Sequence, residues 1–220
     1  MEKNVTGLDE LLAGFAAGTL AEPAQALVGA HLELSVDNRD YVASLEALAG
    51  LGIEEAQPVA LSDRDDALAA IFASDEPISV GTSSPATGNV NESRDPRLPE
   101  SLRRIVGGSL DGVAWKTLLP GVKECKFGEI DGCVASLLWV RAGRAMPSHT
   151  HEGTELTLVL QGGFKDSDGH FERGDIAFAD HEVDHKPIAD EGEDCICFAV
   201  TEGSLRLTGP VGRFFAPFMR

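Results

Sequence analysis

Two histidines and a glutamate lie close together in SHTHEGTELTLVLQGG, residues 148–163. Because successive side chains of a strand point to opposite sides, His149 and His151 share one side, and Glu155 has the same parity. Imidazoles and a carboxylate buried together without partners would be costly, and a divalent cation offsets that cost. The segment therefore predicts a metal site, and His185 in EVDHKPIA is the candidate for a further ligand from another strand.

The donor atoms of this set limit the metal without selecting it. Three imidazoles and one carboxylate suit Zn²⁺, Fe²⁺, Ni²⁺, Mn²⁺ or Cu²⁺. His170 and His181 lie beside the predicted strands, and we interpret them as hairpin and turn residues rather than ligands. Cys195 and Cys197 share one face of a strand, where core packing is the favoured interpretation and reaction with an oxidant is the alternative.

The strands that would position these ligands lie in residues 101–210. Short segments rich in β-forming residues, such as CVASLLWVRA, ELTLVLQG and CICFAVT, are separated by Gly, Asp and Pro. Many short strands without a helical pattern predict a closed or doubled antiparallel sheet. Within this region, SDGHFERGD has the pattern of a hairpin with a glycine turn.

Residues 1–74 have helical periodicity instead. Four apolar residues of GLDELLAGF recur at i, i+3, i+4 and i+7 and share one helix face: Leu8, Leu11, Leu12 and Phe15. Gly18 lies where that helix could end, and the helical pattern of NRDYVASLEALAG ends at Gly50. The region predicts four short amphipathic helices with a core so small that the domain leans on a partner.

The sequence therefore predicts an α+β chain in which a small N-terminal helical bundle precedes the β domain. Residues 75–100 are rich in Pro, Ser, Thr and Asn and predict a flexible linker between the two. The β domain ends near residue 210, and residues 211–220 form a C-terminal tail.

The net charge of −18 excludes some partners. Direct nucleic-acid binding is not expected, because phosphate contacts need cations. An acidic chain can still meet a protein that itself binds DNA. No apolar run has the length of a membrane span, and the N-terminus lacks the pattern of a signal peptide, so we expect a cytoplasmic protein with reduced cysteines.

The spacing around the predicted ligands resembles the first cupin motif at every anchor position. The anchors are Gly143, His149, His151, Glu155 and Gly162. This resemblance covers about the second half of the chain. It implies a metal-binding jelly-roll barrel.

A second and weaker match to the cupin pattern begins at Gly174 and reaches His185 eleven residues later. The proline, glycine and asparagine expected around it are Asp180, Glu182 and Ala189. The metal ligand is thus present in a divergent turn.

The order of the parts resembles the ChrR-type anti-sigma factors, which join a helical anti-sigma domain to a cupin-like domain. The resemblance is carried by ALVGAHLEL, SHTHEGTE and DHEVDHKPIADEGEDCICFA. It implies that the helical domain binds an extracytoplasmic-function sigma factor and blocks its access to core RNA polymerase. It also implies that the cupin domain is a sensor of singlet oxygen or related oxidants, with zinc at the four ligands.

The helical part departs from this family in one respect. Its relatives usually bind a zinc ion there through an early histidine and a His-x3-Cys-x2-Cys stretch. In this chain His31 stands at the histidine, Ser35 and Asn38 stand at the cysteines, and Thr6 stands at the early histidine. We therefore predict no metal in residues 1–74. Apolar packing would replace the zinc, and loss of the partner is the competing account.

Two classes of function remain open at this point. The favoured one is a regulator without turnover, which binds the sigma factor and carries one divalent metal, zinc first and iron, nickel or manganese as alternatives. The other is a metal-dependent cupin enzyme such as a dioxygenase, whose helices would serve dimerisation and whose metal would be iron with open coordination sites. A homodimer through the cupin domain is open in either case.

Overall fold

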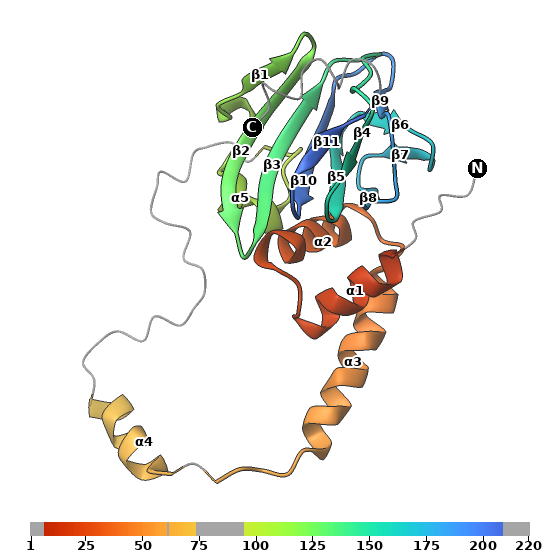
Figure 1. Ribbon diagram of the computed structural model, residues 1–220. Helices are drawn as coiled ribbons and strands as arrows, with labels where there is room; N and C mark the ends of the chain where they lie inside the picture. Colours follow the sequence, from red (N-terminus) through yellow and green to blue (C-terminus); the bar gives the residue numbers. More distant parts are fainter. Residues whose placement is uncertain (1–6, 61, 74–94, 209–220) are drawn as a thin grey trace. The chain divides into compact units, whose positions relative to one another are not determined.

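The computed structural model confirms the predicted α+β class, with helices first and antiparallel strands after them (Figure 1). The residues that the structure describes are 7–60, 62–73 and 95–208. The predicted C-terminal tail, 211–220, lies outside them, as does most of the predicted linker.

Four helices form in the N-terminal part: α1 (Leu8–Ala17), α2 (Glu22–Leu34), α3 (Arg39–Glu55) and α4 (Arg64–Ala73). Helix α1 ends as predicted at Gly18, whose left-handed φ of 66° lets its N–H bond to the carbonyl of Phe15. The predicted end of α3 at Gly50 is wrong, because the helix continues to Glu55. Gly50 does not take the positive φ of a helix stop, and glycine inside a helix costs only about 1 kcal/mol.

Helices α1 and α2 pack against the strands as well as each other. Contacts group residues 1–47 with 94–220, and residues 48–93 form a second unit, so the division by contacts falls inside α3. The predicted domain boundary at residue 74 stays a prediction. Buried leucines of the two helices share one core with the strands: Leu12 and Leu27 with Leu137, Leu158 and Phe198. Among the described residues no single helix is long and apolar enough to cross a membrane. Helices α1 and α2 reach that length and apolar composition only together, and the pair is bent by 106°.

The strands form three antiparallel sheets. The large sheet has the order β1-β2-β3-β10-β5-β8, and the smaller ones are β7-β6-β9 and β11-β4. This is the doubled sheet of a jelly roll, as predicted. The strands are β1 (Lys116–Leu119), β2 (Val122–Ile130), β3 (Cys133–Val140), β4 (His149–His151), β5 (Glu155–Gln161), β6 (Gly163–Lys165), β7 (His170–Glu172), β8 (Ile176–Ala179), β9 (Ile188–Ala189), β10 (Cys195–Thr201) and β11 (Leu205–Leu207).

The packed β part begins at Asp95, inside the range predicted as linker. The buried Asp95 carboxylate accepts hydrogen bonds from the Arg97 guanidinium at 2.7 Å and from the backbone N–H of Leu110 at 3.0 Å. Leu98 is buried in the main core. Short helical turns then lead into β1: η1 (Glu100–Leu102), α5 (Arg103–Val106) and η2 (Leu110–Gly112). For residues 75–94 the linker stays a prediction.

Candidate metal centre

Backbone pairing brings the four predicted ligands to one place. His149 and His151 are both buried on β4, with the half-buried Thr150 between them, which confirms the predicted alternation. His185 lies opposite His149 in an isolated antiparallel bridge, and the two residues exchange backbone hydrogen bonds of 3.1 Å each. Glu155 is the first residue of β5 and is also buried. Strands β4 and β5 and the bridge to His185 therefore bring the four residues together.

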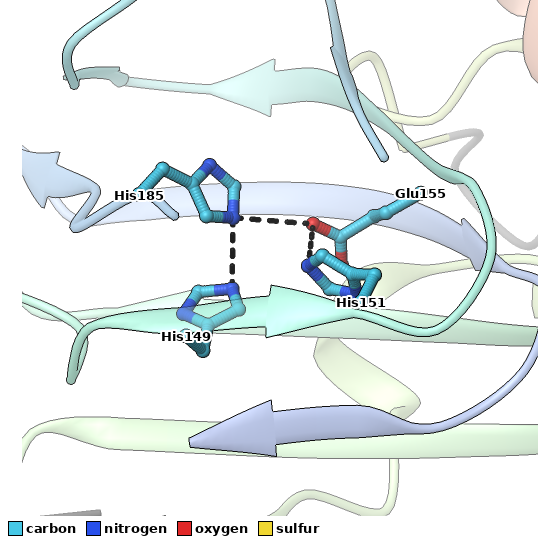
Figure 2. Close-up of side chains that lie close together, drawn as sticks. All are labelled: His149, His151, Glu155 and His185. Atoms are coloured by element: carbon cyan, nitrogen blue, oxygen red, sulfur yellow. Dashed lines mark hydrogen bonds and ion pairs between the residues drawn. The ribbon is translucent and has the colours of Figure 1, made fainter. Parts of the chain in front are cut away.

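The four side chains point toward one another (Figure 2). The Nε2 atoms of His149 and His185 are 2.9 Å apart. One carboxylate oxygen of Glu155 lies 3.2 Å from Nε2 of His151 and 3.9 Å from Nε2 of His185. One ligand atom from each residue falls within 4.8 Å of the others. Such a group could hold one metal ion, since tetrahedral ligands about 2.0–2.2 Å from zinc are about 3.3–3.6 Å from each other.

The tautomers of two histidines favour a cation between them. Nδ1 of His149 lies 2.8 Å from the carbonyl oxygen of Pro147 and donates to it, because a carbonyl can only accept. Nδ1 of His185 faces a carboxylate oxygen of Asp166 at 3.4 Å in the same way. A neutral imidazole with its proton on Nδ1 has a lone pair on Nε2, so two lone pairs face each other when both rings are neutral. This contact is unfavourable alone and is the arrangement that a metal ion needs.

The protonation states also fit a metal. Burial lowers the pKa of His149, so its ring is neutral near pH 7. Burial raises the pKa of Glu155, but the contact with His151 and the other two imidazoles outweighs it and leaves the pKa below its ordinary value. Both ring nitrogens of His151 are buried, and the polar atom beside them is the Glu155 carboxylate oxygen, 3.2 Å from Nε2. Neutral imidazoles beside an ionised carboxylate are the form that binds divalent cations.

Asp166 is the residue near this centre that the sequence did not reveal. Its carboxylate is buried behind His185, and the motif that identifies the ligands does not include it. Burial raises the pKa of Asp166, but hydrogen bonds from His185 and from the backbone N–H groups of Asp168 and Gly169 leave the pKa below its ordinary value. The only local signal is the turn sequence DSDG, which fits many hairpins.

The histidines interpreted as non-ligands lie outside the centre. His170 is on β7 of the predicted hairpin and pairs with the carboxylate of Asp190 at 2.6 Å, and His181 lies in a turn.

The sulfur atoms of Cys195 and Cys197 are 3.5 Å apart and buried in an apolar cluster. The hydrogen bond from Cys195 and burial raise the pKa of Cys197 well above its ordinary value, which favours the protonated thiol and core packing.

His31 is engaged by hydrogen bonds at both ring nitrogens. Its Nδ1 lies 2.6 Å from the carbonyl oxygen of Gly174, and its Nε2 lies 2.9 Å from the side-chain nitrogen of Asn38. The ring is buried, and it links α2 to the turn that precedes β8. Asn38, which stands where the family has a cysteine, thus contacts the histidine directly. The prediction that residues 1–74 bind no metal stays a prediction.

The glycine anchors of the cupin pattern have backbone reasons. Gly143, Gly162 and Gly174 all have positive φ, of 69°, 65° and 95°. A Cβ atom at Gly162 would also lie 2.8 Å from the backbone oxygen of Asp194. These positions therefore require glycine, independently of the metal.

Comparison with known proteins assigns the family. Residues 106–205 match the family model described as ChrR cupin-like domain. Over 212 residues the chain is 40% identical to the anti-sigma-E factor ChrR of Cereibacter sphaeroides, and the match covers 96% of each chain. The chain belongs to the ChrR family.

A solved structure extends this ChrR match to three dimensions. The crystal structure is that of Rhodobacter sphaeroides SigE in complex with the anti-sigma ChrR, and one of its chains is 40% identical to this one. The superposition has a TM-score of 0.73 and covers 88% of this chain and 96% of that chain. Because the match extends well beyond the barrel, it includes helical residues, and the resemblance to ChrR-type proteins is confirmed for both parts.

Proposed function

We propose that this chain is an anti-sigma factor that binds an extracytoplasmic-function sigma factor through its N-terminal helices. The observation that carries the proposal is the 40% identity to the anti-sigma-E factor ChrR along 96% of both chains. A cupin dioxygenase with dimerisation helices would have no reason to match an anti-sigma factor through its helical part. The match therefore favours a regulator over an enzyme.

An apolar helix face supports this reading. On α3, Leu48 and Leu51 are spaced i, i+3, so they share one side of the helix, and they are 66% and 57% exposed. Ile53, on another side of α3, is 77% exposed. Phe72 of α4 is 83% exposed. Exposed apolar residues of this kind mark protein interaction sites, and an amphipathic helix can lay such a face into a groove of its partner.

The charge of the chain fits the same partner. A sigma factor must present basic surface to DNA, and this chain has a net charge of −18. Opposite charge increases the association rate and disfavours wrong partners more than it adds affinity. The acidic chain is thus suited to a basic protein and not to nucleic acid, and both would meet in the cytoplasm.

The barrel would be the sensing part of the protein. Its metal would be held by His149, His151, Glu155 and His185, and zinc fits three imidazoles and one carboxylate in a tetrahedral set. Iron, nickel and manganese suit the same donors, so the ligands do not select zinc by themselves. The input would be singlet oxygen or a related oxidant, as in the family that the sequence resembles.

Binding between purified full-length protein and each extracytoplasmic-function sigma factor of the host tests this function. We expect one of them to bind, and the double substitution Leu48→Asp with Leu51→Asp to weaken it at least tenfold, which corresponds to about 1.4 kcal/mol. Val59→Asp is the matched control, because Val59 is 91% exposed but lies outside the helices. Absence of binding to every sigma factor would overturn the proposal.

A further inference from the structure

We propose that Asp166 is a positioning residue for the metal, acting through His185. Its carboxylate would fix the tautomer and the ring orientation of His185, so that the Nε2 lone pair faces the other three ligands. The inference rests on the proposed metal site and adds a residue that does not itself touch the ion.

The β6–β7 turn holds Asp166 in place. One carboxylate oxygen, Oδ1, accepts hydrogen bonds from the backbone N–H groups of Asp168 at 2.9 Å and Gly169 at 3.2 Å. The backbone N–H of Asp166 donates to the carbonyl oxygen of Gly169 at 3.0 Å. With three bonds inside the turn and a side chain that is 2% exposed, the carboxylate has a fixed direction.

The second carboxylate oxygen is not needed by the turn. Oδ2 lies 3.4 Å from Nδ1 of the buried His185. An asparagine or a serine would satisfy the turn equally well, so the turn does not explain the negative charge. Burying a charge without a partner is costly, and His185 is the partner that Asp166 has here.

The backbone holds His185 less firmly than it holds the two histidines of β4. His149 and His151 are set by strand β4, whereas the sheet pairing of His185, within the described residues, is its bridge to His149. Carboxylates behind ligating histidines fix the ring and raise the basicity of the coordinating nitrogen. Asp166 is placed to do both. It reaches Nδ1 of His185 from the β6–β7 hairpin.

The substitution Asp166→Asn separates the turn from the charge. Asparagine keeps an oxygen for the turn, but its amide N–H₂ group then faces the N–H of His185. The repulsion between these two donors is relieved when His185 moves its proton from Nδ1 to Nε2. That shift removes the Nε2 lone pair that the metal needs. Asp166→Ser is the second variant, because its hydroxyl can serve the turn while nothing faces His185.

Metal binding by the full-length protein tests the inference. Zn²⁺ affinity is measured by competition with a chelator, the Co²⁺-loaded protein by its visible absorption, and the metal-free protein by thermal melting. We expect both Asp166 variants to lose about 10- to 100-fold in Zn²⁺ affinity and to change the Co²⁺ bands, with little change in metal-free melting. Asp180→Asn is the control, since Oδ1 of Asp180 accepts from the backbone N–H of Glu182 at 2.8 Å in a comparable turn.

The outcomes separate this inference from the metal site itself. Variants of Asp166 that keep wild-type affinity and Co²⁺ bands would overturn the positioning role and leave the site standing. An equal loss in Asp180→Asn would also overturn it, because any altered turn would then have the same effect. A wild-type protein that binds neither Zn²⁺ nor Co²⁺ would overturn both the metal site and the inference.

Discussion

Replacing His31 with alanine tests whether the hydrogen bonds of its ring, and not a metal ion, hold the N-terminal helices to the β part. The buried imidazole donates from Nδ1 to the carbonyl oxygen of Gly174 at 2.6 Å and accepts at Nε2 from the amide of Asn38 at 2.9 Å. One neutral tautomer satisfies both bonds, so the ring joins α2, the start of α3 and the β part. The substitution removes both links at once.

The expected loss follows from those two bonds. Each is worth about 1 kcal/mol net, and the buried carbonyl of Gly174 left without a donor adds about 1–2 kcal/mol. We therefore expect His31→Ala to lower the free energy of unfolding by about 3–4 kcal/mol. For a chain of this size that corresponds to a fall in melting temperature of about 6–16 °C.

Urea unfolding followed by circular dichroism measures the change, with metal content determined on the same samples. Asn38→Ala is the matched variant, because it removes only the bond to Nε2 and should cost about 1 kcal/mol. The metal content should be the same in both variants as in the wild type. A loss of less than 0.5 kcal/mol in His31→Ala, on the order of a typical surface substitution, would refute the hydrogen-bond account. Loss of a metal ion in that variant would make His31 a ligand and refute the prediction for residues 1–74.

Three further changes test the barrel. His149→Ala should remove most of the bound metal, measured by mass spectrometry, because the substitution deletes one of the four proposed ligands, and full retention would contradict the assignment. The Arg97 guanidinium holds the pKa of Asp95 well below its ordinary 3.8, so the carboxylate contributes stability that is present above about pH 4 and is lost as the pH falls below it. Asp95→Asn should therefore lower stability by about 2 kcal/mol at pH 7 and less at pH 3, and an equal loss at both values would show that the charge is irrelevant. Gly162→Ala should destabilise the protein by more than about 1 kcal/mol in thermal melting, because its Cβ would meet the backbone of Asp194, and an unchanged melting temperature would contradict this.

The clustering of the four proposed ligands was predictable because their pattern is mostly local. Alternation along one strand places His149 and His151 on the same side, and Glu155 follows at a fixed spacing. His185 was named first as a candidate from another strand and then supported by the longer cupin spacing, since its partner across the bridge lies 36 residues away. Asp166 depends on a hairpin folding back against that bridge, and nothing in its neighbours in the sequence encodes the contact.

The helices show the corresponding limit for the fold. Periodicity identified the apolar face of α1 correctly, but it does not say what covers such a face. Leu12 is buried in the core shared with the strands, whereas Leu48 and Leu51 are exposed on α3 with the same kind of spacing. The difference depends on which surface is complementary in three dimensions, and that information is spread over the whole chain.

Run-off transcription tests the central claim most directly. Core RNA polymerase, the extracytoplasmic-function sigma factor that binds this chain and a promoter for that sigma factor are mixed with increasing amounts of the full-length protein. We predict that transcription falls to the background of core enzyme alone when the chain reaches an amount equimolar to the sigma factor. Transcription that continues unchanged in a large excess of the chain would contradict its assignment as an anti-sigma factor.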